Sequence, residues 1–412
     1  MIIYEIVSTI LFYLCLPFYF LERVIHKKSK GWLKKFGFCE KMSGKVIMIH
    51  GCSVGEINAV GNLVRRIREE FPGYRIVLTT STITGQKVAK EKYSEIADYI
   101  TYFPFDTIFE VSRFLKRIKP SMVFIVETEI WPCFASGCKK RNIPLFIING
   151  RISDQSYPYY NLLGFYFKHV LNNYTTIFTQ SDEDTKKFLS IGEAKEHLKF
   201  MGNLKFDIKK SNVTVDLGQA GYRILIAGST HKPENKIIID IFSKLKSNFP
   251  MLKLVIAPRH LEHTGDIGNL CTQNNLNYGL RSKNDLFSDK TDVIILDTLG
   301  ELGKMYSICD IAFIGGSLNK TGGHNPLEAT IWKKPVISGS CVTNFKDIYG
   351  ILTNCGAAKL VNSEEELYNA LNNILSDNDL YAGMSKSCET VFEQQKEAAN
   401  YVVDVIKQYS MS

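Results

Sequence analysis

Short apolar runs alternate with amphipathic stretches along most of the chain, beginning at Val46. The runs are rich in Val and Ile, whereas the stretches between them repeat their apolar residues at helical spacing. Buried strands that alternate with helices are typical of βαβ units and a parallel sheet. A first group of predicted strands covers 46–50, 75–80, 122–127, 144–149 and 176–180. Predicted helices between them cover 57–70, 107–118 and 159–172.

The alternation stops at a polar, weakly patterned stretch and then begins again. The second group of predicted strands covers 223–228, 252–258, 292–297, 310–316 and 335–339. The final stretch, 384–408, has the pattern of one long amphipathic helix. We therefore expect an α/β protein with two doubly wound, Rossmann-like domains and ligands in a cleft at the carboxyl ends of the strands. The predicted parts are an N-terminal segment 1–45, a domain 46–206, a linker 207–221, a domain 222–385 and a C-terminal helix 386–412, with packing of that helix on the N-terminal domain as one alternative.

Residues 2–21 are predominantly apolar and carry a single charged residue, Glu5. Twenty helical residues are long enough to cross the hydrocarbon core of a bilayer. Glu5 and Pro17 are more compatible with a helix that lies in one leaflet, so a helix that spans the bilayer and a helix in one leaflet both stay open. A cleavable signal peptide has basic residues before its apolar run, whereas here they follow it. The order predicts an uncleaved membrane-anchoring helix with the catalytic domains in the cytoplasm.

The formal net charge of +8 is concentrated in one place. Residues 23–45 hold eight Lys and Arg against one acid, Glu40, and residues 1–22 hold the two acids Glu5 and Glu22, which leaves only +3 on residues 46–412. A basic belt directly after an apolar segment indicates an acidic lipid surface rather than nucleic acid. The ten cysteines are scattered without a C-x-x-C pair, which predicts free thiols in a reducing compartment and no zinc site.

Polar residues gather after the strands of the first half. Ser53 and Glu56 follow the first strand with the spacing of a helix-capping box, and Glu56 is also placed to act as a general base. Glu127 and Glu129 end an apolar strand, where buried carboxylates are costly unless they are paired or used. We expect one of the two to face the cleft and the other a structural partner. Arg151, after the next strand, is a candidate partner for a carboxylate or a substrate anion.

The second half carries features of an anion site at its strand ends. These are the segments 228–231, 258–260, 300–301 and 315–328, which combine glycine turns with basic residues and helix starts. Backbone N–H groups left free there would bind a phosphate, and Glu328 is placed to accept hydrogen bonds from ribose hydroxyls. Each feature alone is more typical of a glycine turn or a surface charge, but four of them at successive strand ends of one domain favour an anion site. Neither G-x-G-x-x-G after a strand nor a P-loop motif is present.

Ten motifs occur in an order that resembles the Kdo (3-deoxy-D-manno-octulosonic acid) transferases of lipopolysaccharide synthesis: SVGE, TTSTITG, ETEIWP, NGRIS, QSDED, GNLKFD, AGSTH, PRH, GELGKMY and GGSLNKTGGHNPLEA. The resemblance covers roughly residues 20–350, with GSCVTNF where GPHTFNF is usual. It implies a GT-B glycosyltransferase at the cytoplasmic inner membrane. The implied reaction is inverting transfer of Kdo from CMP-Kdo to the lipid A precursor, lipid IVA, without a cofactor or metal.

The resemblance also implies roles for individual residues. Glu56 matches the general base, and Glu127 and Lys205 match positions that stabilise the transition state. The segments that match the CMP-binding positions contain Pro258, Arg259, Leu299, Gly300, Glu301, Asn325, Pro326, Leu327 and Glu328. This agrees with the chemistry, because Arg259 and helix N-termini can neutralise the charge that develops on departing CMP.

Three other functions remain to be separated from this one. A nucleotide-sugar 2-epimerase of the same fold would need no lipid acceptor, and the apolar N-terminal segment counts against it. A nucleotide-sugar transferase with a different lipid acceptor, as in peptidoglycan synthesis, is the alternative within the class. A tethered, non-catalytic nucleotide-sugar-binding protein is disfavoured because Glu56, Glu127, Lys205 and Arg259 occur together.

Overall fold

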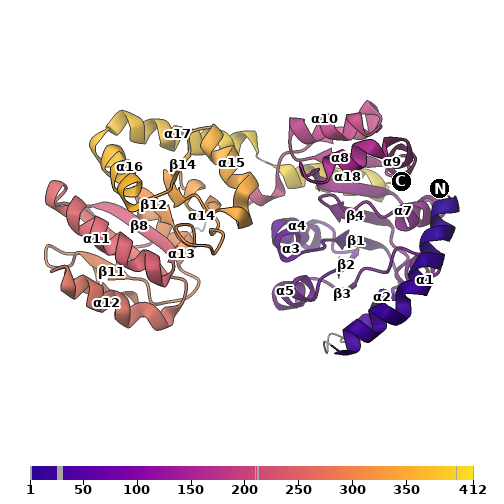
Figure 1. Cartoon of the computed structure of the whole chain (residues 1–412), viewed down its shortest axis with the longest axis horizontal. Coiled ribbons are helices and arrows are strands. Elements are labelled where there is room, and N and C mark those ends of the chain that lie inside the picture. The colour runs from indigo at the N-terminus through magenta and orange to yellow at the C-terminus, as the bar shows by residue number, and fades with distance from the viewer. Residues whose placement is uncertain (1, 26–30, 209, 211–212, 396, 412) are drawn as a thin grey trace. The chain divides into compact units, whose positions relative to one another are not determined.

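The computed structural model describes residues 2–25, 31–208, 210, 213–395 and 397–411. The chain forms two compact units, one made of Met1–Asp207 with Gln395–Ser412 and the other of Ile208–Gln394. Each unit contains a seven-stranded parallel sheet with helices on its faces (Figure 1). The two α/β domains expected from the sequence are therefore present.

The first sheet has the strand order β3-β2-β1-β4-β5-β6-β7. Its strands are β1 Val46–His50, β2 Arg75–Thr80, β3 Tyr99–Tyr102, β4 Met122–Val126, β5 Leu145–Gly150, β6 Thr176–Thr179 and β7 Leu198–Phe200. All five strands predicted in this half are confirmed. The sequence did not reveal β3 and β7, which are short edge strands, and β7 is not buried.

Helices cover both faces of the first sheet and enclose one apolar core on each. They are α1 Ile2–Ile25, α2 Trp32–Lys35, α3 Val54–Ala59, α4 Gly61–Glu70, α5 Ile83–Tyr93, α6 Ile108–Ile118, α7 Pro132–Lys139, α8 Tyr157–Leu162, α9 Gly164–Leu171, α10 Asp182–Ser190 and α18 Ala398–Met411. The predicted helices 57–70 and 159–172 are each two helices, because the backbone leaves helical geometry at Val60 and Leu163. A short 3₁₀ helix, η2 Leu204–Phe206, follows β7.

The second sheet has the order β10-β11-β9-β8-β12-β13-β14. Its strands are β8 Arg223–Thr230, β9 Leu252–Pro258, β10 Tyr278–Leu280, β11 Val293–Ile295, β12 Ile311–Ile314, β13 Val336–Gly339 and β14 Ala358–Val361. Its helices are α11 Lys232–Asn248, α12 Thr264–Gln273, α13 Leu302–Met305, α14 Leu327–Thr330, α15 Lys346–Asn354, α16 Glu364–Ser376 and α17 Asn378–Gln394. The five predicted strands are again confirmed, and the short edge strands β10 and β14 are again the ones that were missed.

Both sheets contain a point where the strand order changes direction. In the first sheet β1 lies between β2 and β4, and in the second β8 lies between β9 and β12. Loops that leave such neighbouring strands run to opposite sides, which opens a crevice at the carboxyl edge where ligands bind. The topology therefore predicts that ligand-binding residues lie in the segments after β1 and β4 and in those after β8 and β12.

The single C-terminal helix predicted over 384–408 was wrong, because α17 ends at Gln394 and α18 begins at Ala398. Glu397, between them, has a positive φ of 73°, which an α-helix does not tolerate. The Asp207 carboxylate accepts a hydrogen bond from the N–H of Ala399 at 2.6 Å and caps the new helix. Helix α18 thus completes the first unit, where the yellow helix lies among purple elements in Figure 1.

No helix in the described part of the chain is long and apolar enough to cross a membrane. The membrane-anchoring helix expected over 2–21 is therefore not supported as a spanning segment. Instead, polar residues of α1 contact the first unit: Glu5 lies 3.1 Å from the ammonium of Lys140, and the Thr9 hydroxyl accepts from the N–H of Ile108 at 3.2 Å. Three lysines of the basic belt, at positions 27, 28 and 30, lie outside the described residues.

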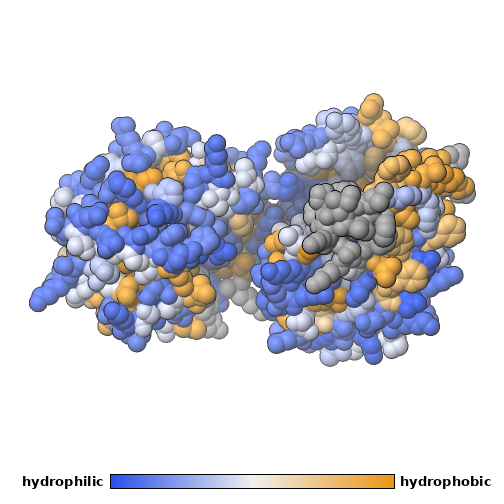
Figure 2. Space-filling view, turned by 60° about the horizontal axis from the view of Figure 1, so that its bottom comes forward, coloured by the Kyte–Doolittle hydropathy of each residue, from blue (hydrophilic) through white to orange (hydrophobic). Residues whose placement is uncertain are grey.

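The opposite side of α1 is apolar and exposed. We call this side the α1 stripe; its members, with 46–75% of their surface exposed, are Ile6, Val7, Ile10, Leu11, Leu14 and Phe18. On the same unit, α8, α9 and the residue between them expose Tyr159, Leu162, Leu163 and Phe165. Figure 2 shows apolar side chains in orange gathered on this unit. The inner side of α1 thus combines the buried Glu5 and Thr9 with Phe12, which packs against Phe36 and Phe105, while the outer side is apolar.

Candidate functional site

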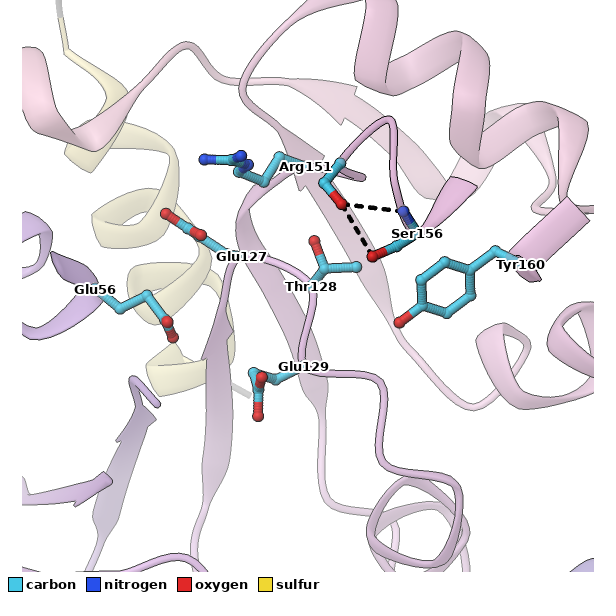
Figure 3. A pocket seen from close by; sticks show the side chains of 8 residues that line it. Glu56, Glu127, Thr128, Glu129, Arg151, Ser156 and Tyr160 are labelled. Atoms are coloured by element: carbon cyan, nitrogen blue, oxygen red, sulfur yellow. Dashed lines mark hydrogen bonds between the residues drawn. The ribbon is translucent and has the colours of Figure 1, made fainter. Parts of the chain in front are cut away.

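A cavity of ≈ 390 Å³ opens in the first unit at the carboxyl ends of β1, β4 and β5. Its lining consists of Glu56, Glu127, Thr128, Glu129, Arg151, Ser153, Ser156 and Tyr160. The structure therefore brings together Glu56 and Glu127, two of the three predicted catalytic residues. Figure 3 shows their carboxylates facing the same space, with Arg151 extended beside Glu127. Thr128, Ser153, Ser156 and Tyr160 were not selected from the sequence, because isolated hydroxyl residues carry no spacing signal.

Glu56 is both a helix-capping residue and a wall of the cavity. Its N–H donates to the Ser53 hydroxyl at 3.4 Å, and that hydroxyl donates to Oε1 of Glu56 at 2.7 Å. The other oxygen, Oε2, accepts from the N–H of Cys52 at 2.7 Å. Burial raises the pKa of the Glu56 carboxyl, the hydrogen bond from Ser53 opposes this rise, and the charge of Glu127 adds to it. The capping and functional interpretations are thus compatible.

Glu127 is held in an uncommon backbone conformation next to a lysine. Its φ of 59° lies in the left-handed region, which costs free energy for a residue with a side chain. Its Oε1 lies 3.7 Å from Nζ of Lys205, the third predicted catalytic residue. Lys205 is in η2, where the N–H of Leu204 donates to Oδ1 of the buried Asn149 at 2.9 Å. The end of β5 thereby positions the lysine against Glu127.

Glu129 also faces the cavity, so the expectation that only one of the two acids would do so was wrong. Its Oε2 accepts from Nε1 of Trp131 at 3.0 Å and lies 3.7 Å from Nε2 of His50. His50 is fully buried, and its Nδ1 lies 3.0 Å from the hydroxyl of Thr79. Glu129 therefore combines both expected roles, since it lines the cavity and has structural partners.

The segments predicted to hold CMP lie at the carboxyl edge of the second sheet. Arg259 follows β9, the segment 299–301 follows β11, and Glu328 is in α14. Burial raises the pKa of Glu328, while the positive charge of Arg259 opposes that rise, so the two side chains are electrostatic neighbours. Pro258 is the last residue of β9. Pro326 is the N-cap residue of α14, and Oδ1 of Asn325 accepts a hydrogen bond from the N–H of Leu327 at 3.1 Å at the start of this helix.

Glu301 is committed to partners within its own unit. Its carboxylate lies 2.7 Å from Nζ of Lys304 and 3.3 Å from Nε of Arg281, and it accepts from the Thr298 hydroxyl at 2.5 Å. Hydrogen bonds from Lys304 and Thr298 lower the pKa of Glu301 to about 2. In the same predicted segment, Leu299 is exposed and Gly300 forms a turn with a φ of 80°. A ligand would therefore meet the backbone groups of these two residues rather than the Glu301 carboxylate, which is already occupied.

Four backbone N–H groups near the end of β8 and after β12 are not free, so these four do not supply the phosphate-binding donors expected there. The fully buried carboxylate of Glu234, in the first turn of α11, accepts from four of them. The donors are the N–H groups of His231 at 3.0 Å, Gly316 at 2.7 Å, Ser317 at 2.9 Å and Leu318 at 3.0 Å. An internal carboxylate thus takes up these four donors, and a bound anion would have to use other groups.

Residues 30–208 match the model of a family described as 3-deoxy-D-manno-octulosonic-acid transferase (kdotransferase). A 3-deoxy-D-manno-octulosonic acid transferase of Haemophilus influenzae is 33% identical over 88% of this chain and 87% of its own length. One of Rickettsia prowazekii is 31% identical over 88% of this chain and 80% of its own length. A bifunctional glycosyltransferase/methyltransferase of Fusobacterium nucleatum is 35% identical over 82% of this chain, which spans only 54% of that longer protein.

Solved structures support the fold. A UDP-GlcNAc 2-epimerase from Neisseria meningitidis aligns with a TM-score of 0.57 and 13% identity, over 88% of this chain and 100% of the other. A glycosyltransferase from Rickettsia africae aligns with a TM-score of 0.51 and 13% identity, over 89% of this chain and 99% of the other. These likenesses show two Rossmann-like domains, as in the GT-B fold, whereas the sequence relatives identify the family. The chain belongs to the 3-deoxy-D-manno-octulosonic acid (Kdo) transferase family and is a glycosyltransferase.

Proposed function

We propose that this enzyme transfers Kdo from CMP-Kdo to the lipid A precursor, lipid IVA, with inversion at the anomeric carbon, as a step of lipopolysaccharide core synthesis. The observation that carries the proposal is the cavity of the first unit, which is lined both by Glu56, a carboxylate with a raised pKa, and by Glu127, whose carboxylate is paired with the ammonium of Lys205. A base and a separate positive group are what an inverting displacement requires.

In this reaction Glu56 accepts the proton of the acceptor hydroxyl while that oxygen attacks the anomeric carbon of Kdo. The bond from this carbon to the phosphate oxygen breaks, and its electron pair leaves with CMP. The ammonium of Lys205, held 3.7 Å from Glu127, stabilises negative charge as it develops, and the Glu127 carboxylate stabilises positive charge on the sugar ring. The raised pKa of Glu56 strengthens it as a base at neutral pH.

The donor is assigned to the second unit. Arg259 supplies positive charge, the exposed backbone of Leu299 and Gly300 supplies hydrogen-bonding groups, and the Asn325–Glu328 segment supplies a carboxylate for the ribose hydroxyls. Glu301 contributes by fixing this loop through Lys304 and Arg281 rather than by contacting the nucleotide. Charge on departing CMP is then neutralised by protein groups without a cofactor.

The lipid acceptor implies that the enzyme works at the cytoplasmic face of the inner membrane. The α1 stripe supports this, because six exposed apolar side chains on one helix face favour contact with a lipid interface. The basic belt adds attraction to acidic headgroups. We therefore propose that α1 attaches the first unit to one leaflet.

The proposal is tested by following CMP release from CMP-Kdo with and without lipid IVA, together with mass spectrometry of the lipid product. We expect release that depends on the acceptor and a product heavier by one or more Kdo residues. CMP release without acceptor, or none with it, would contradict the proposal. Conversion of UDP-GlcNAc by the same protein would instead favour the epimerase alternative.

A further inference from the structure

Two histidines far apart in the sequence form a direct pair in the second unit. Nε2 of His231 lies 3.0 Å from Nε2 of His324, and the two ring planes differ by only 9°. His231 directly follows β8, and His324 lies in the segment between β12 and α14. The pair therefore joins the segments that follow two neighbouring strands, at the point where the strand order changes direction. Both side chains are partly exposed, so the pair is accessible from solvent.

The geometry limits how many protons the pair can hold. Two ring nitrogens 3.0 Å apart form a hydrogen bond only if one carries a proton and the other presents its lone pair. The neutral pair therefore has one proton between the two Nε2 atoms and a second on Nδ1 of the accepting ring. One further proton can bind at the remaining Nδ1 without breaking this bond. Two protonated Nε2 atoms would repel each other, so the paired rings accept one additional proton and no more.

The groups around the pair keep it neutral in the absence of a ligand. Burial, the neighbouring His231 and the charge of Arg259 lower the pKa of His324 to about 4. Burial also lowers the pKa of His231, and the charge of Glu234 only partly opposes this. His260 lies beside His231, with ring centroids 5.7 Å apart.

The acids near this cluster are largely occupied. Glu234, the carboxylate that faces the pair, accepts from four backbone N–H groups. Glu262 lies 3.7 Å from Nδ1 of His260, and Asp266 lies 3.7 Å from His263 and 3.2 Å from Lys232. The positive charge of Arg259, which acts on both His231 and His324, is therefore available to stabilise an additional anion beside the pair.

The surrounding backbone is shaped to hold the pair. Gly316 has a φ of 70°, and a Cβ at this position would lie 2.8 Å from the His324 ring and 3.4 Å from Nε2 of His231. The N–H of Gly323 donates to the carbonyl of Gly316 at 2.7 Å, which fixes the loop that carries His324. A side chain at 316 would therefore separate the rings, so this glycine is needed where it stands.

We propose that the His231–His324 pair is a proton-linked part of the donor site, which takes up one proton when an anionic group of the sugar nucleotide binds beside it. The inference rests on the proposed function, because it assumes that the second unit binds the donor. The shared chemistry of the ligand group is a negative charge, supplied either by the phosphate or by the sugar carboxylate. A bound anion stabilises the protonated pair, so donor affinity should rise as the pH falls toward neutrality and below.

The test is isothermal titration calorimetry of the full chain with CMP near pH 7.5, repeated in buffers with different ionisation enthalpies. CMP is then mostly a dianion, because the second pKa of a phosphate monoester is about 6. The dependence of the observed heat on buffer enthalpy gives the number of protons taken up per CMP. We expect about half a proton or more for the unmodified protein and close to none for His231→Gln and His324→Gln. His263→Gln, outside the pair, is the matched control and should keep the uptake.

Titrations with CMP, cytidine and CMP-Kdo show whether the phosphate or the sugar carboxylate supplies the negative charge. Uptake with CMP but not with cytidine identifies the phosphate, whereas uptake only with CMP-Kdo identifies the carboxylate. Binding of CMP and CMP-Kdo without proton uptake, or uptake that persists in both glutamine variants, would overturn the proton linkage and leave the proposed function intact. Absence of CMP and CMP-Kdo binding by the unmodified protein would overturn both. Should a variant fail to fold, ¹⁵N-histidine shifts of the unmodified protein during the CMP titration report the protonation of both rings directly.

Discussion

The hydroxyl of Ser53 donates a hydrogen bond of 2.7 Å to the carboxylate of Glu56 and also accepts the N–H of the same residue. One side chain therefore both caps helix α3 and stabilises the charged form of the candidate base. Burial raises the pKa of Glu56, and this hydrogen bond opposes that rise and so increases the ionised fraction of the base at a given pH.

Replacement of Ser53 by Ala should move the acidic limb of the pH–rate profile to higher pH. The hydrogen bond lowers the pKa of Glu56, so its loss leaves the burial effect less opposed and the carboxyl protonated at higher pH. The measurement is kcat/KM against pH. Ser363→Ala is the matched control, because Ser363 caps α16 in the same way. Both variants should lose about 1 kcal/mol of stability, but only Ser53→Ala should shift the limb.

Glu56→Gln should reduce Kdo transfer by about 10²- to 10⁴-fold, because the amide cannot accept the proton of the acceptor hydroxyl. CMP affinity, measured by calorimetry, should stay unchanged, since the proposed nucleotide residues belong to the second unit. Glu69→Gln, an exposed change on α4, serves as control. Transfer at near-normal rate in Glu56→Gln would remove this residue from the role of base.

Lys205→Ala should lower kcat by about 10²- to 10³-fold, the usual loss for a group that stabilises developing charge. It also leaves Glu127, 3.7 Å from the ammonium, without this ion-pair partner. Lys199→Ala, at an exposed position of β7, is the control and should be neutral. A rise in the KM for lipid IVA with unchanged kcat would assign Lys205 to acceptor binding instead.

The double change Leu11→Glu with Leu14→Glu should weaken binding to phosphatidylglycerol vesicles by at least about tenfold, because it places charge on the α1 stripe. Both side chains are more than half exposed, at 58% and 66%, so the fold should tolerate the change. The control is Met251→Glu with Leu286→Glu, two exposed apolar positions of the second unit. Vesicle sedimentation gives the binding, and equal loss in both double variants would contradict the assignment.

Glu234→Gln should destabilise the second unit by about 1–3 kcal/mol, because an amide nitrogen cannot accept from the N–H groups that now face a carboxylate oxygen. Urea unfolding followed by tryptophan fluorescence is suitable, since Trp332 belongs to this unit. Glu364→Gln, in the exposed first turn of α16, is the control. Unchanged stability would show that the four hydrogen bonds of Glu234 contribute little in solution.

Much of the fold was predictable because parallel strands are buried on both faces. Such strands appear as uninterrupted apolar runs, as in β1 and β9, where every residue is buried. Edge strands such as β7 and β10 need not be buried on both faces, so they lack such apolar runs and were not predicted. The break between α17 and α18 was missed because its cause, the capping of Ala399 by Asp207, joins residues 192 positions apart.

The sequence by itself determined the two α/β domains, the family and the candidate residues Glu56, Glu127 and Lys205, because strand ends and local motifs are properties of neighbouring residues. Only the tertiary structure decided how these residues are used. It turned Glu5 of α1 inward, paired backbone N–H groups of the expected phosphate site with Glu234, and joined His231 to His324 across 93 positions. Such contacts depend on how separate elements pack, since a side chain's partners across a sheet are not encoded in its local pattern.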